Sequence, residues 1–214
     1  MTKGRGGKQA LLQSAIDYVA AHGVGDRSLR EIAAELGSSH RMLIYHFGSK
    51  EGLLVEIIRV MEQRQRALLE ELDDLETASP LDVAREFWQR VADPALWPYE
   101  RLFFEVYGRA LQGDPESRPL LDGVIDAWLD PLARAFRRAG MHPDHARDHA
   151  RLGLAVARGL LLDLLATGER AAVDGAMEQF ITMYETVLEN AVPGTTAPAR
   201  AHPPVVTGPE AKTT

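Results

Sequence analysis

The chain has 214 residues, of which 45% are hydrophobic and 26% are charged, a composition typical of globular proteins with a full core. It contains no cysteine, which excludes disulfide bonds, thiolate metal sites and a thiol nucleophile. Residues 1–50 carry seven Lys/Arg and four Asp/Glu, so a net charge of −7 divides into +3 here and −10 in the remainder. This asymmetry fits a polyanion-binding head on an acidic body, and it also fits chance surface charge.

Neither a signal peptide nor a membrane span is expected. The amino-terminal segment is basic, but polar residues interrupt its apolar positions. The longest apolar stretch, residues 152–166, contains Arg158 and Asp163 and is shorter than the roughly 20 residues that a membrane helix needs. We therefore expect a buried helix there, and a cytoplasmic protein with no membrane partner.

Helical periodicity dominates the first part of the chain, and strand patterns are nearly absent. Ser28, Ser39 and Ser49 each precede an apolar-periodic segment and are suited to cap its helix. Gly37 is suited to end the second helix. The expected helices are 9–21, 29–36, 40–46 and a long one from residue 50.

Five more helices are expected after a break at residues 78–80. Pro131 lies inside one of them and should kink it near Ala127, whose carbonyl loses its amide donor. From Pro193 onward the apolar content is too low to pack, which predicts a disordered tail. The expected helices are 81–92, 97–111, 116–139, 144–167 and 170–191, and the expected domains are 1–49, 50–191 and the tail, 192–214.

The segment from Ser28 to Phe47 has the spacing of a helix-turn-helix motif. Ala33 is small enough for two helices to cross closely, and Gly37, four residues later, accepts a left-handed turn. The amino-terminal half of the second helix would then be free to enter a DNA major groove. A generic helical hairpin has the same spacing and remains an alternative.

Two runs in this region, LREIAAELGSS and LIYHFGSKEGLL, resemble the DNA-binding head of the TetR family of bacterial transcriptional regulators. The sequence resemblance covers about residues 8–56, and the nine-helix layout extends it to about residue 191. It implies an all-α, two-domain architecture: a three-helix helix-turn-helix head and a helical body that binds an effector and dimerises. It also implies a regulator without enzymatic activity and without a cofactor.

The resemblance assigns roles within the head by position. Tyr45, His46 and Lys50 match phosphate-contacting positions, and Ser38 and Ser39 match positions that contact the DNA backbone. The residues that match positions facing base edges are His40, Arg41 and Met42. The full set of candidate DNA-binding residues is Ser28, Ser38, Ser39, His40, Arg41, Met42, Tyr45, His46 and Lys50.

The chain also departs from the family pattern in this head. Arg41 stands where a small residue is common, and it could bond a guanine through two donors. Ser38 occupies a position that is usually apolar. Ile44 replaces a tyrosine that often contacts DNA, and we expect it to pack inward.

Two further charged or histidine-rich segments allow more than one interpretation. Lys3, Arg5 and Lys8 could form a flexible basic arm that attracts phosphates, or could have no role. His145 and His149 are four residues apart on a helix, but the zinc-protease pattern is absent and a solvated helix start is the expected reading. No metal is therefore predicted.

Aromatic residues are concentrated in the body, where helical core packing accounts for most of them. In proteins similar to TetR the middle helices enclose an effector pocket, and such pockets are apolar with few polar groups. The candidate ligand-binding residues are Trp88, Phe104, Tyr107 and Trp128, with Arg109 as a polar anchor.

The last two helices are apolar on more than one side, whereas a surface helix is apolar on one stripe only. A homodimer with two helices from each subunit explains this pattern, and a monomer with a deeply buried hairpin is the alternative. The candidate interface residues are Leu160, Leu161, Leu164, Leu165, Phe180, Tyr184 and Leu188.

These observations predict a ligand-responsive transcriptional regulator that binds a double-stranded DNA operator as a homodimer. A repressor is expected, which releases its operator when a small apolar or amphipathic effector binds the body. A helical small-molecule-binding protein or enzyme with a purely structural head is one alternative, and a protein–protein adaptor is another.

Overall fold

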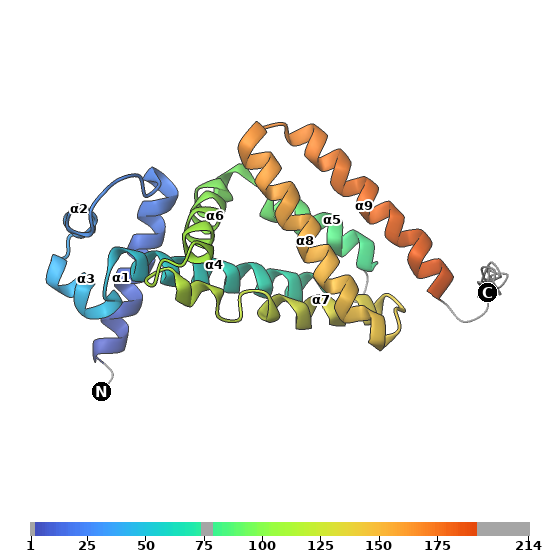
Figure 1. Ribbon diagram of the computed structural model, residues 1–214, viewed down its shortest axis with the longest axis horizontal. Helices are drawn as coiled ribbons and strands as arrows, with labels where there is room; N and C mark the ends of the chain where they lie inside the picture. The colour runs from blue at the N-terminus through green and yellow to red at the C-terminus, as the bar shows by residue number, and fades with distance from the viewer. Residues whose placement is uncertain (1–2, 74–78, 192–214) are drawn as a thin grey trace, which may run out of the picture.

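The computed structural model describes residues 3–73 and 79–191, and within these ranges the chain is all-α, as predicted. Nine α-helices and two short 3-10 turns make up the described elements. A small head of α1–α3 (residues 3–47) lies at one end of the molecule, and α4 (Lys50–Asp73) runs from it into a body formed with α5–α9 (residues 80–191) (Figure 1). The tail predicted from residue 192 lies outside the described residues.

The head helices begin at polar caps, as the sequence predicts. Ser28 and Glu31 form a reciprocal capping box, in which each side chain accepts from the other residue's backbone amide. The Ser39 hydroxyl accepts from the amide of Met42, and Gly37 between the two helices has a φ of 62°. The head helices are α1 (Lys3–His22), α2 (Leu29–Glu35) and α3 (His40–Phe47).

The predicted flexible basic arm is wrong as a description of this segment, because α1 begins at Lys3 and not near Gln9. Lys8 is a helical residue whose ammonium lies 3.0 Å from a carboxylate oxygen of Glu56. The same ammonium lies 5.5 Å from the centre of the Phe47 ring. Lys8 therefore ties α1 to α4 and has an internal partner for its charge.

The middle of the chain forms the first three helices of the body and one 3-10 turn. Ser49 caps α4, since its hydroxyl accepts from the amide of Gly52. Ser79 caps α5 through the amide of Asp82, and Pro80 occupies the first helical position, where its missing N–H costs nothing. The elements are α4 (Lys50–Asp73), α5 (Pro80–Val91), η1 (Pro94–Leu96) and α6 (Trp97–Leu111).

The single helix predicted over 116–139 is wrong, because this segment contains a 3-10 turn, η2 (Arg118–Leu121), and then α7 (Asp126–Arg138). Gly123 separates the two with a φ of 73°, a conformation that a right-handed helix cannot contain. Pro131 lies in the second turn of α7. The carbonyl that loses its donor, that of Ala127, therefore belongs to the first turn, and the predicted kink point coincides with the start of the helix.

The last two helices are α8 (Pro143–Thr167) and α9 (Arg170–Ala191), joined at Gly168 in a left-handed conformation. They lie side by side and run antiparallel along one side of the body (Figure 1). On the inner side, α9 is tied to α5 by Arg85, whose guanidinium lies within 3.3 Å of carboxylate oxygens of Glu178 and Glu185.

The head and the body share a hydrophobic core. The cluster that contains Leu43 of α3 and Ile16 of α1 also contains Leu102 and Val106 of α6. The buried Tyr99 hydroxyl, at the start of α6, donates a 3.0 Å hydrogen bond to the carbonyl of Ile16. A displacement of α6 therefore acts directly on α1.

Candidate DNA-binding face and effector cavity

One side of α3 is buried and the other is exposed. Leu43 is fully buried and Phe47 nearly so, and they fix the helix on the head core. His40, Arg41 and Met42 lie on the exposed side at the amino-terminal half of the helix, so their side chains are free to meet a partner. This is the half of a recognition helix that contacts base edges.

The carboxyl-terminal half of α3 presents aromatic and basic groups. Tyr45 is 77% exposed, and its ring lies 4.9 Å from that of the half-buried His46. Lys50 is half-buried and donates a 3.3 Å hydrogen bond to the carbonyl of Gly25. Ile44 is 42% exposed, so the prediction that it packs inward is wrong. Leu43 and Phe47, four positions apart, already occupy the inward side of α3. Ile44, one position after Leu43, is rotated away from that side.

The three candidate DNA-binding serines differ in whether their hydroxyl groups are already used to cap a helix. The Ser28 hydroxyl both donates to Glu31 and accepts from its backbone amide, so capping α2 already uses it. Ser39 is exposed and uses its oxygen to accept from Met42. Ser38, half-buried in the turn, bonds through its own amide to the Ala33 carbonyl.

Replacing Arg41 with alanine is expected to relax sequence preference at one base pair of each half-site. A guanidinium that bonds a guanine through two donors discriminates against the wrong base by about 1–3 kcal/mol. Binding-site selection from a random duplex pool measures the change directly. Arg30, exposed on α2, provides the control: Arg30→Ala should leave the selected motif unaltered, and an unaltered motif for Arg41→Ala would contradict the prediction.

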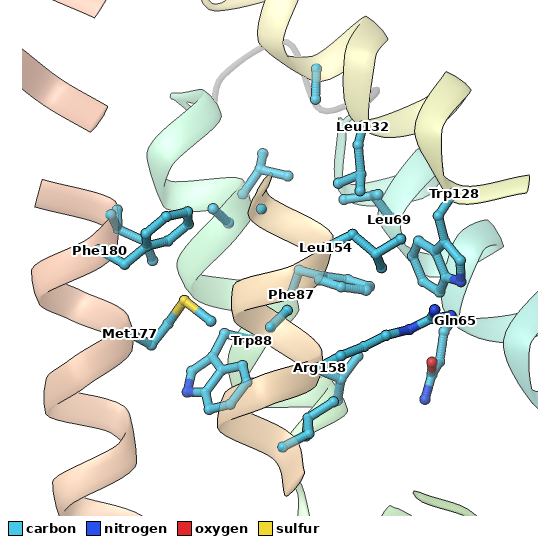
Figure 2. Close-up of a pocket in the computed structure, with 18 of the residues that line it drawn as sticks. Gln65, Leu69, Phe87, Trp88, Trp128, Leu132, Leu154, Arg158, Met177 and Phe180 are labelled. Atoms are coloured by element: carbon cyan, nitrogen blue, oxygen red, sulfur yellow. The ribbon is translucent and has the colours of Figure 1, made fainter. Parts of the chain in front are cut away.

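The body contains a cavity of about 160 Å³. All six helices from α4 to α9 contribute to its wall, which is mostly aliphatic and aromatic. Met177 and Phe180 of α9 lie on one side, and Arg158 extends from α8 toward Gln65 and Trp128 on the other (Figure 2). The cavity therefore has an apolar body and one polar end.

Three of the five predicted ligand-binding residues line this cavity: Trp88, Phe104 and Trp128. Tyr107 and Arg109 do not, so the structure does not bring them together with the others. Tyr107 stacks on Phe103, with ring centres 5.3 Å apart. The Arg109 guanidinium lies 2.6 Å from Glu105 and 3.8 Å from Glu51, on the head side of α6.

The polar groups that do line the cavity were not predicted. Glu62 of α4 accepts a 2.5 Å hydrogen bond from the Trp128 indole, and its carboxylate lies 3.4 Å from Arg158. Glu100 of α6 accepts a 2.6 Å hydrogen bond from the Gln65 amide. One feature of the sequence indicates this polar end of the cavity: Arg158 interrupts the longest apolar stretch, residues 152–166.

Both carboxyl groups are perturbed by burial. Removal from water raises the pKa of Glu62, although the charges of Arg158 and Arg66 and the Trp128 hydrogen bond oppose this. Burial raises the pKa of Glu100 to about 7, and the neighbouring charge of Glu62 adds to the effect. At neutral pH the Glu100 carboxyl is thus close to half protonated.

Replacing Glu100 with glutamine should make the protein's stability less sensitive to pH. The folded protein holds the Glu100 proton more tightly than the unfolded chain does. This contribution to stability is therefore fully present below pH 4.5 and is lost as the pH rises to about 7, by up to about 1.4 kcal/mol per pH unit. Urea unfolding at pH 5 and pH 7.5 measures the difference, and parallel pH profiles for the variant and the parent would contradict it.

The residues predicted for the dimer interface lie mainly on the inner side of α8 and α9. For Leu161, Leu164 and Tyr184 the prediction is wrong, because these side chains are buried within their own subunit. Leu161 and Leu164 pack in one cluster with Trp88 of α5, and Tyr184 packs with α7. The other predicted interface residues, Leu160, Leu165, Phe180 and Leu188, are half-buried.

A second stripe on each helix is exposed instead. Leu152 and Leu162 of α8 are 50% and 51% exposed, and Met183 and Val187 of α9 are 60% and 39% exposed. Alanine, glycine and one glutamine lie between them at intervals of three and four positions, the spacing of helices that pack along a seam. We define the α8–α9 face as Leu152, Ala155, Gly159, Leu162 and Ala166 with Ala172, Ala176, Gln179, Met183 and Val187.

The histidine-rich start of α8 has structural roles. His142 is the N-cap of the helix, and His149 contacts the Tyr184 hydroxyl at 3.0 Å. His145 is exposed. Across residues 3–73 and 79–191, no group of three or more His, Cys, Asp or Glu side chains is placed to hold a metal ion. None of the described helices is long and apolar enough to cross a bilayer.

Comparison with known proteins agrees with this architecture. Residues 11–57 match the profile of bacterial regulatory proteins of the tetR family. No curated protein sequence is similar enough to count as a relative. Among solved structures, a transcriptional regulator from Rhodococcus sp. Rha1 is 20% identical, with 84% of this chain and 96% of that chain covered and a TM-score of 0.68.

A TetR-family transcriptional regulator from Pectobacterium atrosepticum is 16% identical, with 92% of this chain and 99% of that chain covered and a TM-score of 0.66. At these identities the likeness shows the fold of the whole described chain, and the profile identifies the head. The head therefore has the amino-terminal domain of the tetR family of bacterial regulatory proteins, and the described chain as a whole has the fold of these solved regulators.

Proposed function

We propose that the protein is a dimeric repressor that releases its operator when a small apolar or amphipathic effector occupies the cavity. The observation that carries this proposal is that α4 and α6 each pack against the head and also line the cavity. Leu54 and Ile58 of α4 pack in the head core, and Glu62 and Gln65, on the next turns, line the cavity. A ligand that changes the tilt of α4 therefore moves the head with it.

The proposed DNA contacts follow from exposure on α3. His40, Arg41 and Met42 would read base edges in the major groove. Tyr45, His46 and Lys50 would hold phosphates and fix the register of the helix. Because its target is genomic DNA, we place the protein in the bacterial cytoplasm.

The proposed partner of the α8–α9 face is a second copy of the same face. A twofold axis would align the two stripes of small and apolar residues in a four-helix interface. Two heads would then grip half-sites about one helical turn, or a modest multiple, apart. Exposure of Leu162 and Met183 in the single subunit supports this arrangement, because pairing removes their apolar surface from water.

The proposed link between effector and operator runs through the first turn of α6. Tyr99 bonds to the Ile16 carbonyl of the head, and its neighbour Glu100 lines the cavity. A ligand can shift the head only if it binds one of two conformations more tightly. A ligand held by Glu100 acts on the same turn of helix that supports α1.

The function is tested by selecting binding sites from random duplex DNA and then titrating benzene-sized compounds into the complex. We expect a twofold-symmetric motif bound by one dimer, weakening steeply with salt, and released by at least one compound that binds the protein. Retention of the operator when the cavity is saturated would contradict effector-driven release. Failure to select any motif would contradict sequence-specific DNA binding.

A further inference from the structure

We infer that the cavity takes a compact aromatic or alicyclic amine, whose ring fills the apolar part while its ammonium group pairs with Glu100. This inference rests on the proposed function, because it names the chemical class of the effector. It is carried by the size of the cavity, by its apolar wall and by the buried carboxyl group of Glu100 at its polar end.

The size and lining of the cavity limit the apolar part of the ligand. At about 160 Å³, it is close to the cavity of about 150 Å³ that binds benzene in an engineered protein. Phe87 and Trp128 meet edge-to-face in its wall, with ring centres 5.9 Å apart, and Leu69, Leu132 and Leu154 lie beside Trp128 (Figure 2). A single ring with a short arm fits, and a fused polycyclic ligand does not.

Glu100 is the acceptor left for the ligand. Its side chain is only 6% exposed, and its one hydrogen-bond partner among the described residues is the uncharged Gln65 amide. None of the ion pairs in the described part of the chain includes it. A buried carboxylate without a cation is costly, and a cationic ligand would supply the missing partner.

The two arginines at this end already pair with the same carboxylate, that of Glu62. Arg158 lies 3.4 Å from Glu62, donates to the Val124 carbonyl at 3.3 Å and stacks over the Phe103 ring at 4.8 Å. Arg66 lies 3.6 Å from the same Glu62 carboxylate and is not part of the cavity lining. An anionic ligand would have to take Arg158 from Glu62 and leave that carboxylate short of a partner.

Binding of an amine would also change the protonation of Glu100. The carboxyl faces Gln65 and Glu62 from α4 and Arg158 from α8. Burial and the charge of Glu62 raise the pKa of Glu100 to about 7, although Gln65 and Arg158 favour its ionised form. An ammonium group favours the ionised carboxylate, so the Glu100 proton is released on binding. A neutral ligand of the same shape gives no such release.

The test compares three probes of one shape: benzylamine, benzyl alcohol and sodium benzoate. Titration calorimetry at pH 7 should give benzylamine about 10- to 100-fold tighter binding than benzyl alcohol, the gain of a hydrogen bond to a charged group. Benzoate should bind more weakly than either. At pH 6, calorimetry in buffers of different ionisation enthalpy should detect proton release with benzylamine alone.

Glu100→Gln should remove both the amine preference and the proton release, whereas Glu105→Gln, on the same helix but outside the cavity, should preserve them. Equal affinities for benzylamine and benzyl alcohol, tighter binding of benzoate, or no binding of any probe would each overturn the inference. These measurements contain no DNA. Tight benzylamine binding without operator release would therefore contradict the repressor function and leave the assignment of the ligand class intact.

Discussion

Glutamates at positions 162 and 183 should convert the protein into a 23.6 kDa monomer that no longer holds its operator. Leu162 and Met183 are 51% and 60% exposed in the single subunit, and both belong to the α8–α9 face. Each glutamate would face its symmetry mate or another glutamate across the interface. Burying unpaired carboxylates there costs several kcal/mol each, which is enough to dissociate a dimer.

Loss of the dimer should reduce operator affinity by about 10³-fold or more, because one head alone retains little beyond non-specific phosphate attraction. Analytical ultracentrifugation measures the mass, and fluorescence anisotropy measures DNA binding. The double variant Leu162→Glu/Met183→Glu should keep its helical circular dichroism, since neither side chain belongs to the subunit core.

Leu111→Glu provides the matched control. Leu111 is 65% exposed at the end of α6, away from the α8–α9 face, so the same change there should leave a dimer with full operator affinity. A dimeric double variant would show that the subunits associate through a different surface.

The second large effect is expected for Arg158→Met, which removes one cation from the buried carboxylate of Glu62. The side chains of Arg158 and Glu62 are 17% and 13% exposed, so the carboxylate that remains is poorly solvated. Breaking a buried pair from one side costs about 3–5 kcal/mol, and the lower end applies here because Arg66 stays near Glu62. Urea unfolding at pH 8 measures the loss.

This loss should shrink at lower pH. Burial already raises the pKa of Glu62, and removal of Arg158 raises it further, so the carboxyl takes up a proton sooner as the pH falls. The double variant Arg158→Met/Glu62→Gln should recover most of the stability at pH 8, because it removes the buried carboxylate together with its cation, and the Arg66 side chain that remains is 23% exposed to water. If the double variant is as unstable as the single one, Arg158 contributes through its packing on Phe103 and not through its charge.

The head could be predicted from sequence because its signals are local. The Ser28–Glu31 capping box, the Ser39 cap and the turn at Gly37 each involve residues within a few positions of one another. Errors arose where a local rule admitted two outcomes. Ile44 is such a case, since an apolar residue in a short helix can face either side.

The polar end of the cavity depends on contacts that no local pattern contains. Glu62 and Arg158 are separated by 96 positions, and Gln65 and Glu100 by 35. Their pairing follows from how α4, α6 and α8 cross, which apolar periodicity does not specify. Tyr107 lies on the same side of α6 as Glu100 but two turns further along the helix, and Arg109 lies on the opposite side, so neither reaches the cavity.

The same limit explains the shift in the predicted interface. The sequence of α8 shows an excess of leucine, but it has two stripes, and periodicity alone does not say which one the subunit buries. Leu161 and Leu164 face α5, and Leu162 between them faces outward. A shift of one position around the helix separates a core residue from a surface residue.

The placement of the tryptophans gives the protein an intrinsic optical probe. Of its three indoles, those of Trp88 and Trp128 form part of the cavity wall, whereas Trp97 lies outside it at the start of α6. The two wall indoles donate to carboxylates, Trp88 to Asp174 at 2.7 Å and Trp128 to Glu62 at 2.5 Å. Their emission should therefore respond to a guest in the cavity, while a Trp97→Phe variant would remove the constant background. Occupancy can then be followed by fluorescence in the unlabelled protein, even while it is bound to DNA.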